Sequence, residues 1–569
     1  MIDFKNEIAL MLNEKIGEIS KDEIFQNIEV PPSYDMGDFA FPTFPLAKVF
    51  RKNPAVIATE LKESIESDMF EKIETKGAYL NFFINKEKLA QTVIEESIEK
   101  GEDFGRVDIG EGKNIIVEYS SPNIAKPFHI GHIRTTIIGD SLKRIFSFLG
   151  YNAIGYNHLG DYGTQFGMLI VAIKKWGNLK EIENNPIPEL LKLYVKINEE
   201  IENDEKLHRE CRDAFVDLEN KDPEAVKMWE WIRNISLEEF KRVYRMLDID
   251  FDSYKGEHFY SDKMAEQVEK MEKQGILVDS EGAKIVDLEK YNLPPALIIK
   301  SDGSTIYITR DVAAAKYRHD NYKPYKNIYV VASQQNLHFQ QLKYVLKEMG
   351  YDWYDEVTHV PFGMVSLEEG TLSTRKGRVV YLEDVLNRAI DKVDDILTER
   401  EEEKGIKIED KEELAREIGI GAVKFQELFN QRIKDYVFSW DKTLSFEGET
   451  GPYVQYVHAR ICSLLKKGDF SLDMEFDPSL LKTEEEINVL RVLYNFTDTV
   501  IDAHEKMEPF FITRYVVELA KEFNKFYNRV PILDEDEKLK NTRLLLCYTV
   551  KNVIKKGLYL LGIKAPEKM

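Results

Sequence analysis

The sequence predicts a multidomain α/β protein: a doubly wound parallel sheet with a helical insertion, preceded by an N-terminal α+β module and followed by a C-terminal all-α helix bundle. Three observations support this prediction. A chain of 569 residues is too long for one hydrophobic core. Strand–turn–helix units recur near residues 115–149 and 327–349, and such alternation is typical of parallel sheets. From about Leu414 onward, strand signals fade and long helical patterns replace them.

The elements divide the chain into three expected domains. Residues 1–110 should form a separate module, because amphipathic stretches surround a proline- and glycine-interrupted segment (31–54) and a strand-like run, GAYLNFFI, at 77–84. A linker follows in GRVDIGEGKN (105–114), and a central domain should span 111–445 with a highly charged helical insertion near 178–245. Residues 446–569 should form the bundle, with helical spacing at Ile512, Tyr515, Val516, Leu519, Phe523, Phe526 and Tyr527.

Composition limits the class of protein. Hydrophobic residues make up 43% and charged residues 31% of the chain, no apolar run reaches membrane-spanning length, and we expect a cytoplasmic protein without membrane association. Cys211, Cys462 and Cys547 are dispersed, which predicts neither a disulfide framework nor a protein-bound zinc site. The net charge of −23 argues against a nucleic-acid partner, but residues 446–569 carry 18 basic and 20 acidic side chains. A near-neutral domain of this kind can present a basic face.

The stretch SSPNIAKPFHIGHIRTTIIGD (120–140) lies between a predicted strand, NIIVEYS, and a predicted helix. At the carboxyl edge of a parallel sheet, the free amides and partial positive charge of such a helix start favour a phosphate. Gly131 would let the backbone approach a nucleotide, and His129 and His132 could donate hydrogen bonds during displacement at an α-phosphate. For an arbitrary HxGH turn, the better interpretation would be that the two histidines only cap the helix or occupy polar positions in the turn, without binding a ligand.

The neighbouring motifs weaken that alternative. HIGH after a first strand resembles the first signature of class I aminoacyl-tRNA synthetases, and SSPNIAKPFHIGHIRTTIIGDSL is similar to the version in the arginyl-tRNA synthetase family. Further segments agree in order: HLGDYGTQFG (158–167), IYITRDVAAA (306–315), ASQQNLHF (332–339), LSTRKGRVV (372–380) and GPYVQYVHARI (451–461). The resemblance runs to the last residue and implies a Rossmann-like catalytic domain, an N-terminal domain that touches the D-loop corner of tRNA and an anticodon-binding bundle.

The resemblance also implies the reaction. ATP, as its Mg²⁺ complex, would activate L-arginine to arginyl-adenylate, and the terminal ribose of tRNA(Arg) would then take the arginyl group. We expect the first step to need bound tRNA, no covalent enzyme intermediate, no metal held by the protein itself, and a monomer.

The resemblance places the arginine contacts on five residues. Glu118 and Asp311 would face the guanidinium, which has five donors and no acceptor, so that carboxylates suit it. Asn123 and Gln335 would fix the α-amino and carboxylate ends, and Tyr307 would form one wall. Two structural alternatives remain open. Asp311 could cap the helix that follows it, and Glu118 could form an ion pair with Arg134 or Arg310.

The second ATP element departs from the family's KMSKS loop. Residues 371–377 read TLSTRKG, with Thr371 and Thr374 at the two lysine positions. Lys376, Arg375 and Lys126 are therefore the candidates to balance the leaving pyrophosphate, and Ser373 is an expected ATP contact. The resemblance lays adenine against backbone at Gly363, Met364 and Val365. Two roles are open for the polar residues of HLGDYGTQFG: they would either form the floor of the substrate pocket or have a purely structural role. These residues are His158, Asp161 and Gln165.

For tRNA binding, we expect Arg460 as a phosphate contact, together with Lys466 and Lys467, and Tyr453 or Tyr456 as stacking partners for bases. The aromatic residues of FNKFYNRV (523–530) should instead be core, because they follow helical spacing. In the N-terminal module, the residues that could serve RNA binding are Phe39, Phe41, Lys48, Arg51 and Lys52.

Three other functions would each explain part of the sequence. The cysteinyl enzyme has a similar C-terminal domain but needs a cysteine-rich zinc site that three dispersed cysteines cannot build. A small HxGH nucleotidylyltransferase would leave more than half of the chain unexplained. A non-catalytic tRNA-binding paralogue fits the altered lysine loop, whereas the intact His129, Gly131 and His132 speak against it.

Overall fold

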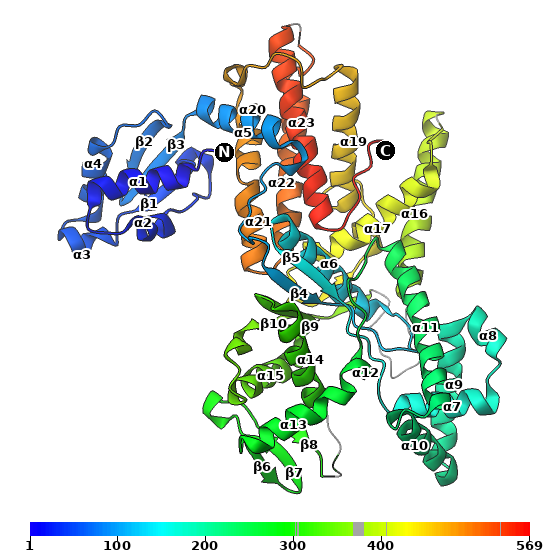
Figure 1. Cartoon of the computed structure of the whole chain (residues 1–569). Helices are drawn as coiled ribbons and strands as arrows, with labels where there is room; N and C mark the ends of the chain where they lie inside the picture. Colours follow the sequence, from blue (N-terminus) through cyan, green and yellow to red (C-terminus); the bar gives the residue numbers. More distant parts are fainter. Residues whose placement is uncertain (302, 304–306, 368–380, 406, 535) are drawn as a thin grey trace.

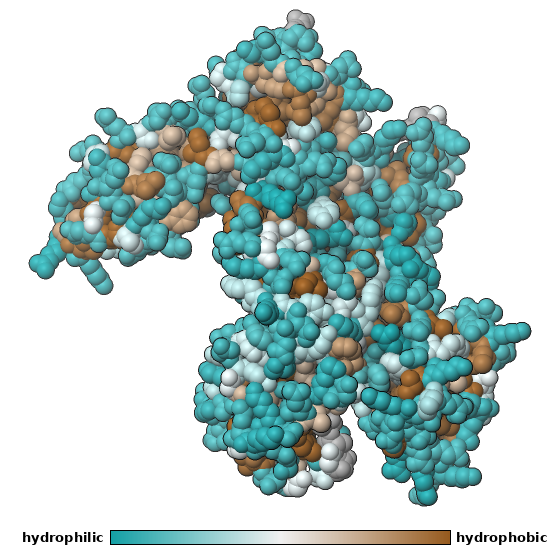
Figure 2. All heavy atoms as spheres, viewed as in Figure 1, coloured by the Kyte–Doolittle hydropathy of each residue, from teal (hydrophilic) through white to brown (hydrophobic). Residues whose placement is uncertain are grey.

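The computed structural model describes residues 1–569 except 302, 304–306, 368–380, 406 and 535. Figure 1 shows an N-terminal module packed against one side of a C-terminal helix bundle, with a central sheet beneath the bundle and two lobes below the sheet. Figure 2 shows a hollow between the two lobes. One lobe carries α7 to α11 and the other carries β6 to β8 with α13 to α15.

The central sheet has the order β10-β9-β4-β5, and all of its pairs are parallel. Its strands are β4 (Asn114–Glu118), β5 (Asn152–Tyr156), β9 (Lys326–Ala332) and β10 (Val357–Phe362). The run Ile115, Ile116 and Val117 is fully buried, as expected for a strand that is covered on both faces. The chain leaves β4 for β5 on one side and later returns with β9 on the other. This reversal of strand order, beside Glu118 and Tyr329, is the place where doubly wound sheets bind ligands.

Helices connect these strands. They are α6 (Ile133–Phe148), between β4 and β5, and α15 (Asn336–Glu348), between β9 and β10, with the short helices η3 (Ile130–His132), η6 (Ser333–Gln335) and η7 (Asp352–Glu356). Gly150 follows α6 with a φ of 85°, a backbone conformation that suits glycine, so the predicted stop of this helix is confirmed. The predicted α/β class, with a doubly wound parallel sheet, is confirmed.

The predicted helical insertion is present between β5 and β9. Its helices are α7 (Thr164–Trp176), α8 (Leu179–Asn184), α9 (Pro186–Ile201), α10 (Glu205–Glu219) and α11 (Pro223–Met246). The second lobe follows with α12 (Glu257–Tyr260), η4 (Ser261–Lys263), α13 (Met264–Lys273), η5 (Glu289–Tyr291), α14 (Tyr307–Tyr322) and the antiparallel strands β6 (Leu277–Ser280), β7 (Ala283–Val286) and β8 (Ala296–Ile299). This small sheet was not expected from the sequence pattern.

The N-terminal module contains α1 (Phe4–Ile16), α2 (Lys21–Asn27), η1 (Tyr34–Met36), α3 (Leu46–Phe50), α4 (Pro54–Ser64) and an antiparallel sheet of order β1-β3-β2, formed by β1 (Phe39–Pro42), β2 (Phe70–Lys76) and β3 (Tyr79–Ile84). The predicted strand GAYLNFFI corresponds to β3. Then α5 (Lys86–Lys100) and η2 (Gly101–Asp103) lead toward the central sheet. The module docks on the bundle through the ion pair of Asp38 with Arg491, 2.7 Å long and largely buried.

The remaining chain is mainly helical. Its elements are β11 (Val365–Leu367), α16 (Leu382–Lys404), α17 (Lys411–Phe429), β12 (Tyr436–Phe438), α18 (Trp440–Thr443), α19 (Gly451–Lys467), η9 (Pro478–Leu480), α20 (Glu484–Tyr494), α21 (Phe496–Glu505), α22 (Phe510–Arg529) and α23 (Glu537–Leu560). The predicted helical face of α22 is buried from Ile512 to Phe526, but Tyr527 is 38% exposed and is not a core residue.

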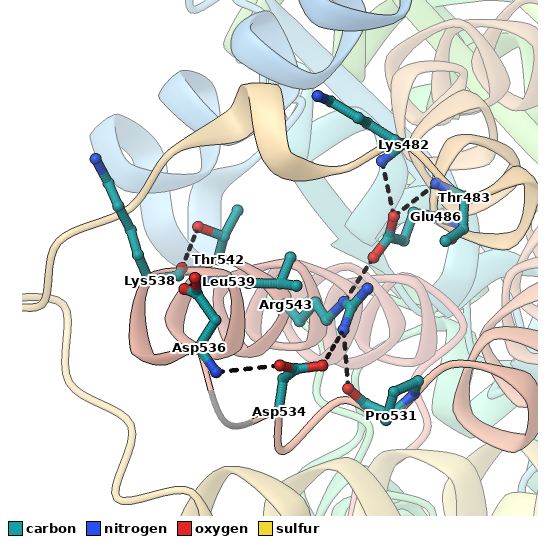
Figure 3. Close-up of polar contacts among 10 residues, drawn as sticks. All are labelled: Lys482, Thr483, Glu486, Pro531, Asp534, Asp536, Lys538, Leu539, Thr542 and Arg543. Atoms are coloured by element: carbon teal, nitrogen blue, oxygen red, sulfur yellow. Dashed lines mark hydrogen bonds and ion pairs between the residues drawn. The ribbon is translucent and has the colours of Figure 1, made fainter.

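A buried ion pair joins two helices of the bundle (Figure 3). The guanidinium of Arg543 on α23 donates to Glu486 on α20 over 2.7 Å, and both side chains are nearly inaccessible to water. Glu486 also accepts hydrogen bonds from the backbone of Lys482 and Thr483 at the start of α20. The same carboxylate therefore caps one helix and binds the other.

In the described part of the chain, no helix is long and apolar enough to cross a membrane. The three cysteines are free thiols. Among the described residues there is also no group of three or more His, Cys, Asp or Glu side chains arranged to hold a metal ion.

Candidate active site

The loop that leaves β4 has an unusual backbone. Ser120, Ser121 and Ala125 have φ values of 69°, 48° and 60°, in the left-handed region that non-glycine residues rarely adopt. The loop is held by buried hydrogen bonds: Ser120 N–H donates to Thr135 Oγ1 over 3.0 Å, and Ser120 Oγ lies 2.8 Å from Tyr244 Oη of α11. Because strain of this kind persists only where the surroundings enforce it, the loop is a candidate functional element.

His129 and His132 lie together where this loop ends and α6 begins, with ring centroids 4.0 Å apart. The backbone N–H of Gly131 donates to Nδ1 of His129 over 3.0 Å, which leaves Nε2 of His129 as the proton carrier in the neutral ring. A Cβ at position 131 would lie 2.7 Å from the His129 ring. Glycine at this position therefore leaves room for the His129 ring to fold over the backbone of residue 131.

Both imidazoles are neutral at physiological pH. Burial lowers the pKa of His129. Burial, together with repulsion from His129 in its protonated form, lowers the pKa of His132 to about 3. A neutral imidazole can donate one hydrogen bond to a phosphate without bringing a competing permanent charge. The site can thus respond to negative charge that develops on a bound triphosphate.

The HIGH turn is also anchored to the chain that follows residue 380. His129 pairs with Tyr381 in an isolated antiparallel bridge, and the N–H of Leu382 donates to the carbonyl of Phe128 over 2.9 Å. Lys126 lies beside the insertion, with Nζ 5.9 Å from the ring centroid of Tyr194. Three predicted ATP-site residues lie outside the described residues: Ser373, Arg375 and Lys376.

The predicted adenine segment follows β10 and contacts the β12 region. Gly363 N–H donates to the carbonyl of Arg432 over 2.8 Å, and Met364 N–H donates to Asp435 Oδ1 over 2.5 Å. Val365 opens β11, which pairs with β12. The amides of Gly363 and Met364 are already engaged within the protein, whereas the side chain of Met364 is 48% exposed.

Glu118, at the carboxyl end of β4, forms a buried ion pair. Its Oε2 lies 2.5 Å from Nη2 of Arg318 on α14, and Arg318 is completely buried, with its guanidinium 4.2 Å from the ring centroid of Tyr156. An ion pair was one alternative expected for Glu118, but the expected partners were wrong, because Arg134 binds Glu427 and Arg310 binds Glu257. The negative charge of the Glu118 carboxylate is therefore balanced by the guanidinium of Arg318.

Asp311 has a different kind of partner. Its Oδ2 lies 2.6 Å from Nε2 of His338, and its side chain is 26% exposed. Burial raises the pKa of Asp311, but the hydrogen bond and charge of His338 outweigh it, so the pKa is lowered; the reciprocal effect raises the pKa of His338. The helix-capping alternative is wrong, because α14 already begins at Tyr307 and places Asp311 in its second turn.

The other three predicted arginine contacts are exposed. Tyr307, at the first position of α14, is 71% exposed. Gln335 ends η6, directly after β9, and Asn123 lies in the strained loop, where its backbone bridges to Gly160. The structure places the charges of Glu118 and Asp311 around the same two histidines, His158 and His338, whereas the other three side chains are exposed.

In the motif HLGDYGTQFG, Asp161 links two elements of the fold and His158 lies among charged groups. Asp161 accepts from Arg233 Nε over 3.0 Å and from the backbone N–H of His258 over 2.8 Å, so it joins the insertion to α12. His158 packs on the Tyr260 ring; burial lowers its pKa, and the charges of Glu118, Arg318, Asp311 and Asp161 all reach it. Gln165, near the start of α7, is half-buried.

Three residues in the pocket were missed by sequence analysis: Glu257, Arg318 and His338. His338 lay within the motif ASQQNLHF and could have been singled out, but a single histidine there carried no further signal. Glu257 and Arg318 gave no signal, since charged residues on amphipathic helices are usually exposed.

The predicted RNA contacts form a cluster on the bundle. Arg460 Nη1 donates to Asn524 Oδ1 over 2.7 Å, and the amide of Asn524 donates to Tyr453 Oη over 2.8 Å. The guanidinium of Arg460 lies 4.9 Å from the ring centroid of Tyr456 and 5.1 Å from that of Tyr527. The cluster combines a cation with aromatic faces, as single-stranded RNA sites do.

Comparisons with known proteins agree with this geometry. Residues 94–440 match the family model described as "tRNA synthetases class I (R), catalytic domain", which covers more than half of the chain. The chain belongs to the arginyl-tRNA synthetase family. Residues 3–84 match the "Arginyl tRNA synthetase N terminal domain" and residues 454–569 the "DALR anticodon binding domain" of this family's models.

Individual members of the family resemble the chain over its whole length. The arginine–tRNA ligases of Halothermothrix orenii and Clostridioides difficile are 58% and 55% identical to it, with 100% of each chain covered. The crystal structure of arginyl-tRNA synthetase from Plasmodium falciparum superposes with a TM-score of 0.84 at 25% identity, covering 100% of both chains. The Thermus thermophilus arginyl-tRNA synthetase shares the fold, with a TM-score of 0.79 at 24% identity and the same coverage.

Proposed function

We propose that this chain activates L-arginine with ATP and transfers the arginyl group to the 3′ end of tRNA(Arg), and that Asp311 is the carboxylate that receives the guanidinium of the substrate. The observation that carries the assignment of Asp311 is its partner. Among the pocket carboxylates of the described chain, Asp311 is held by an imidazole, whereas Glu118, Asp161 and Glu257 are each paired with an arginine. A guanidinium ligand can replace a histidine here and form a stronger, bidentate pair.

The reaction then follows from the arrangement of the site. The arginine carboxylate attacks the α-phosphate of ATP, pyrophosphate leaves, and the terminal ribose of the tRNA takes the acyl group. His129 and His132 donate hydrogen bonds to the phosphate oxygens, and Gly131 lets the nucleotide approach the start of α6. Asn123 and Gln335 bind the two ends of the amino acid, and Tyr307 closes over it.

The proposal also covers the contacts with ATP and with tRNA. Mg²⁺ enters with ATP as part of the substrate. Lys126, Arg375 and Lys376 balance the pyrophosphate, Ser373 contacts ATP, and Gly363, Met364 and Val365 flank the adenine. The RNA contacts are Arg460, Tyr453 and Tyr456. We further propose that the three domains divide near residues 110 and 445 and that the protein acts as a monomer in the cytoplasm.

ATP–pyrophosphate exchange, measured for each amino acid with and without total tRNA, tests this function. Of all the amino acids, we expect only arginine to support exchange, and only when tRNA is present. Exchange driven by cysteine or by no amino acid would contradict the proposal. The Asp311→Asn variant should raise the KM for arginine by about 10²-fold or more while changing the KM for ATP little, because it removes one charged partner of the guanidinium. Equal effects on both constants would remove Asp311 from the arginine site.

A further inference from the structure

The insertion helix α11 packs directly on the turn that carries His129 and His132. The ring of Phe128, which precedes His129, stacks on that of His132 with centroids 5.0 Å apart. The same ring contacts Phe240 and Tyr244 of α11, with centroids 5.7 Å and 5.5 Å away. Aromatic rings at these distances are in direct contact. The position of the turn is therefore set in part by α11, which belongs to the helical insertion.

The chain at the start of α16 is the second neighbour of this turn. Tyr381 pairs with His129 in an isolated antiparallel bridge, and the N–H of Leu382 donates to the carbonyl of Phe128 over 2.9 Å. Two short strands paired in this way are only marginally stable in water, so the bridge needs a further restraint. The next residue in the chain, Glu383, supplies one.

Glu383 binds Arg242 of α11 through two hydrogen bonds. Nη1 and Nη2 of Arg242 donate to Oε1 and Oε2 of Glu383, each over 2.6 Å. A guanidinium and a carboxylate joined in this bidentate way fix their relative orientation as well as their distance. The hydrogen bonds from Arg242 lower the pKa of Glu383, so the carboxylate is charged at physiological pH. The side chains are 42% and 33% exposed, and the pair is therefore a weak source of overall stability.

Packing alone does not fix this side of the turn. A cavity of about 200 Å³ lies between the insertion, the turn and the start of α16, and its lining includes Phe128, Phe240, Tyr381 and Glu383. Side chains that border empty space have no packing partner there, so the cavity leaves room for Tyr381 to move relative to Phe128. Arg242 also lines the cavity, and its ion pair with Glu383 joins α11 to α16 beside it.

We propose that Arg242 and Glu383 are positioning residues for catalysis. Their ion pair holds Tyr381 against the HIGH turn and keeps the imidazole of His129 in place beside the α-phosphate of ATP. This inference rests on the role of His129 under the proposed function. Without the pair, the turn would sample arrangements in which the His129 donor is misplaced, and a misplacement of about 1 Å can cost about 10²-fold in rate.

The test is single-turnover activation of arginine, together with ATP–pyrophosphate exchange, by the full chain with saturating tRNA. Glu383→Gln should lower the activation rate about tenfold and change the KM for arginine by less than about twofold, since the proposed arginine contacts lie outside the bridge. In a His129→Ala background, the same change should cost less than about twofold, because the pair acts through His129. As a control, Glu449→Gln breaks an ion pair with Arg514 of similar exposure, 46% and 40%, and should leave the rate unchanged.

Two results would overturn the inference: an unchanged activation rate in Glu383→Gln, or the same loss with and without His129, which would make the pair purely structural. If Glu383→Gln fails to fold, Arg242→Lys keeps the charge but removes the bidentate geometry. This variant should lower the rate about threefold, and persistence of that loss in the His129→Ala background would also overturn the inference. Failure of the proposed function looks different, since His129→Ala alone would then leave the activation rate unchanged.

Discussion

At the scale of single residues, the contact between Asp311 and His338 sets the charge state of the carboxylate that we propose for arginine binding. The two side chains are 2.6 Å apart and about a quarter exposed. Their interaction raises the pKa of His338 above its ordinary value, although burial alone would lower it. Asp311 and Glu118 are the charged groups that act on this histidine. If Asp311 receives the substrate guanidinium, as we propose, a protonated His338 competes with it for the same carboxylate.

This competition predicts a pH dependence of arginine binding. Below its raised pKa, His338 is charged and holds Asp311, and above that pKa the imidazole is neutral and holds it weakly. The KM for arginine should therefore fall as pH rises, by at most about tenfold per pH unit, and level off above the pKa of His338. In His338→Gln, which keeps a donor but does not titrate, the profile should be flat across the same range.

The matched control for this measurement is His319→Gln. His319 also contacts a carboxylate, Glu356, at 3.0 Å, but it stacks on Trp353 away from the pocket. This variant should keep the wild-type profile. A wild-type slope that persists in His338→Gln would show that another group controls arginine binding.

At the scale of elements, buried charge pairs join helices that are distant in sequence. Arg134 at the start of α6 binds Glu427 of α17, and Arg543 of α23 binds Glu486 of α20. In each case the chain has taken two charges out of water, and the pair is tolerated because backbone groups satisfy further hydrogen bonds. Figure 3 shows this for Arg543, which also donates to Asp534 and to the carbonyl of Pro531.

Removing one partner of such a pair should be costly. Arg543→Met should lower the free energy of unfolding of the bundle by about 3 to 5 kcal/mol, because Glu486 would remain as a buried, uncompensated charge. Arg529→Met is the control on neighbouring helices: its partner Glu485 is 3.1 Å away, but Arg529 is 69% exposed, so the cost should be below about 1 kcal/mol. Denaturant unfolding followed by circular dichroism compares the two. Similar losses would mean that Glu486 is satisfied by the backbone alone.

At the scale of the whole molecule, one buried lysine connects the insertion, the catalytic domain and the end of the bundle. Lys424 of α17 donates to the carbonyl of Leu247 at the end of α11 and, over 2.6 Å, to that of Gly562 after α23. A cavity of about 140 Å³ opens beside it. Burial lowers the pKa of Lys424 to about 8. The three parts thus meet around an ammonium group that has no carboxylate partner within ion-pair distance among the described residues.

The lowered pKa predicts how stability changes with pH. Between about pH 8 and the ordinary lysine value, the unfolded chain holds a proton that the folded chain has lost, so the stability of the wild type should rise with pH in this window. The gain should be on the order of 1 kcal/mol for each pH unit. Thermal melts at pH 8 to 10 should show the melting temperature of the wild type rising relative to that of Lys424→Met. A constant difference would mean that Lys424 titrates normally.

The motifs predicted candidate site residues, but not how the charges among them pair. The adjacency of His129 and His132 is local, because a three-residue turn fixes it. The family resemblance predicted that Glu118 and Asp311 face one guanidinium, and this stays a prediction. The predicted ion-pair partners of Glu118 and the predicted helix-capping role of Asp311 were both wrong. The sheet β6 to β8 was missed, because its short strands alternate weakly in burial. Positions 373, 375 and 376 lie outside the described residues and stay predictions.

The sequence by itself determined the α/β class, the helical bundle and the HIGH turn, since hydrophobic periodicity and local backbone geometry act over a few neighbouring residues. Only the tertiary structure decided which arginine neutralises which carboxylate. Arg310 and Arg318 lie two turns apart on one helix, yet they bind residues from α12 and β4 that are far away in the chain. Coulomb attraction acts between whatever charges the packing brings together, regardless of their separation in the sequence. Burial then makes each ion pair costly in free energy to break.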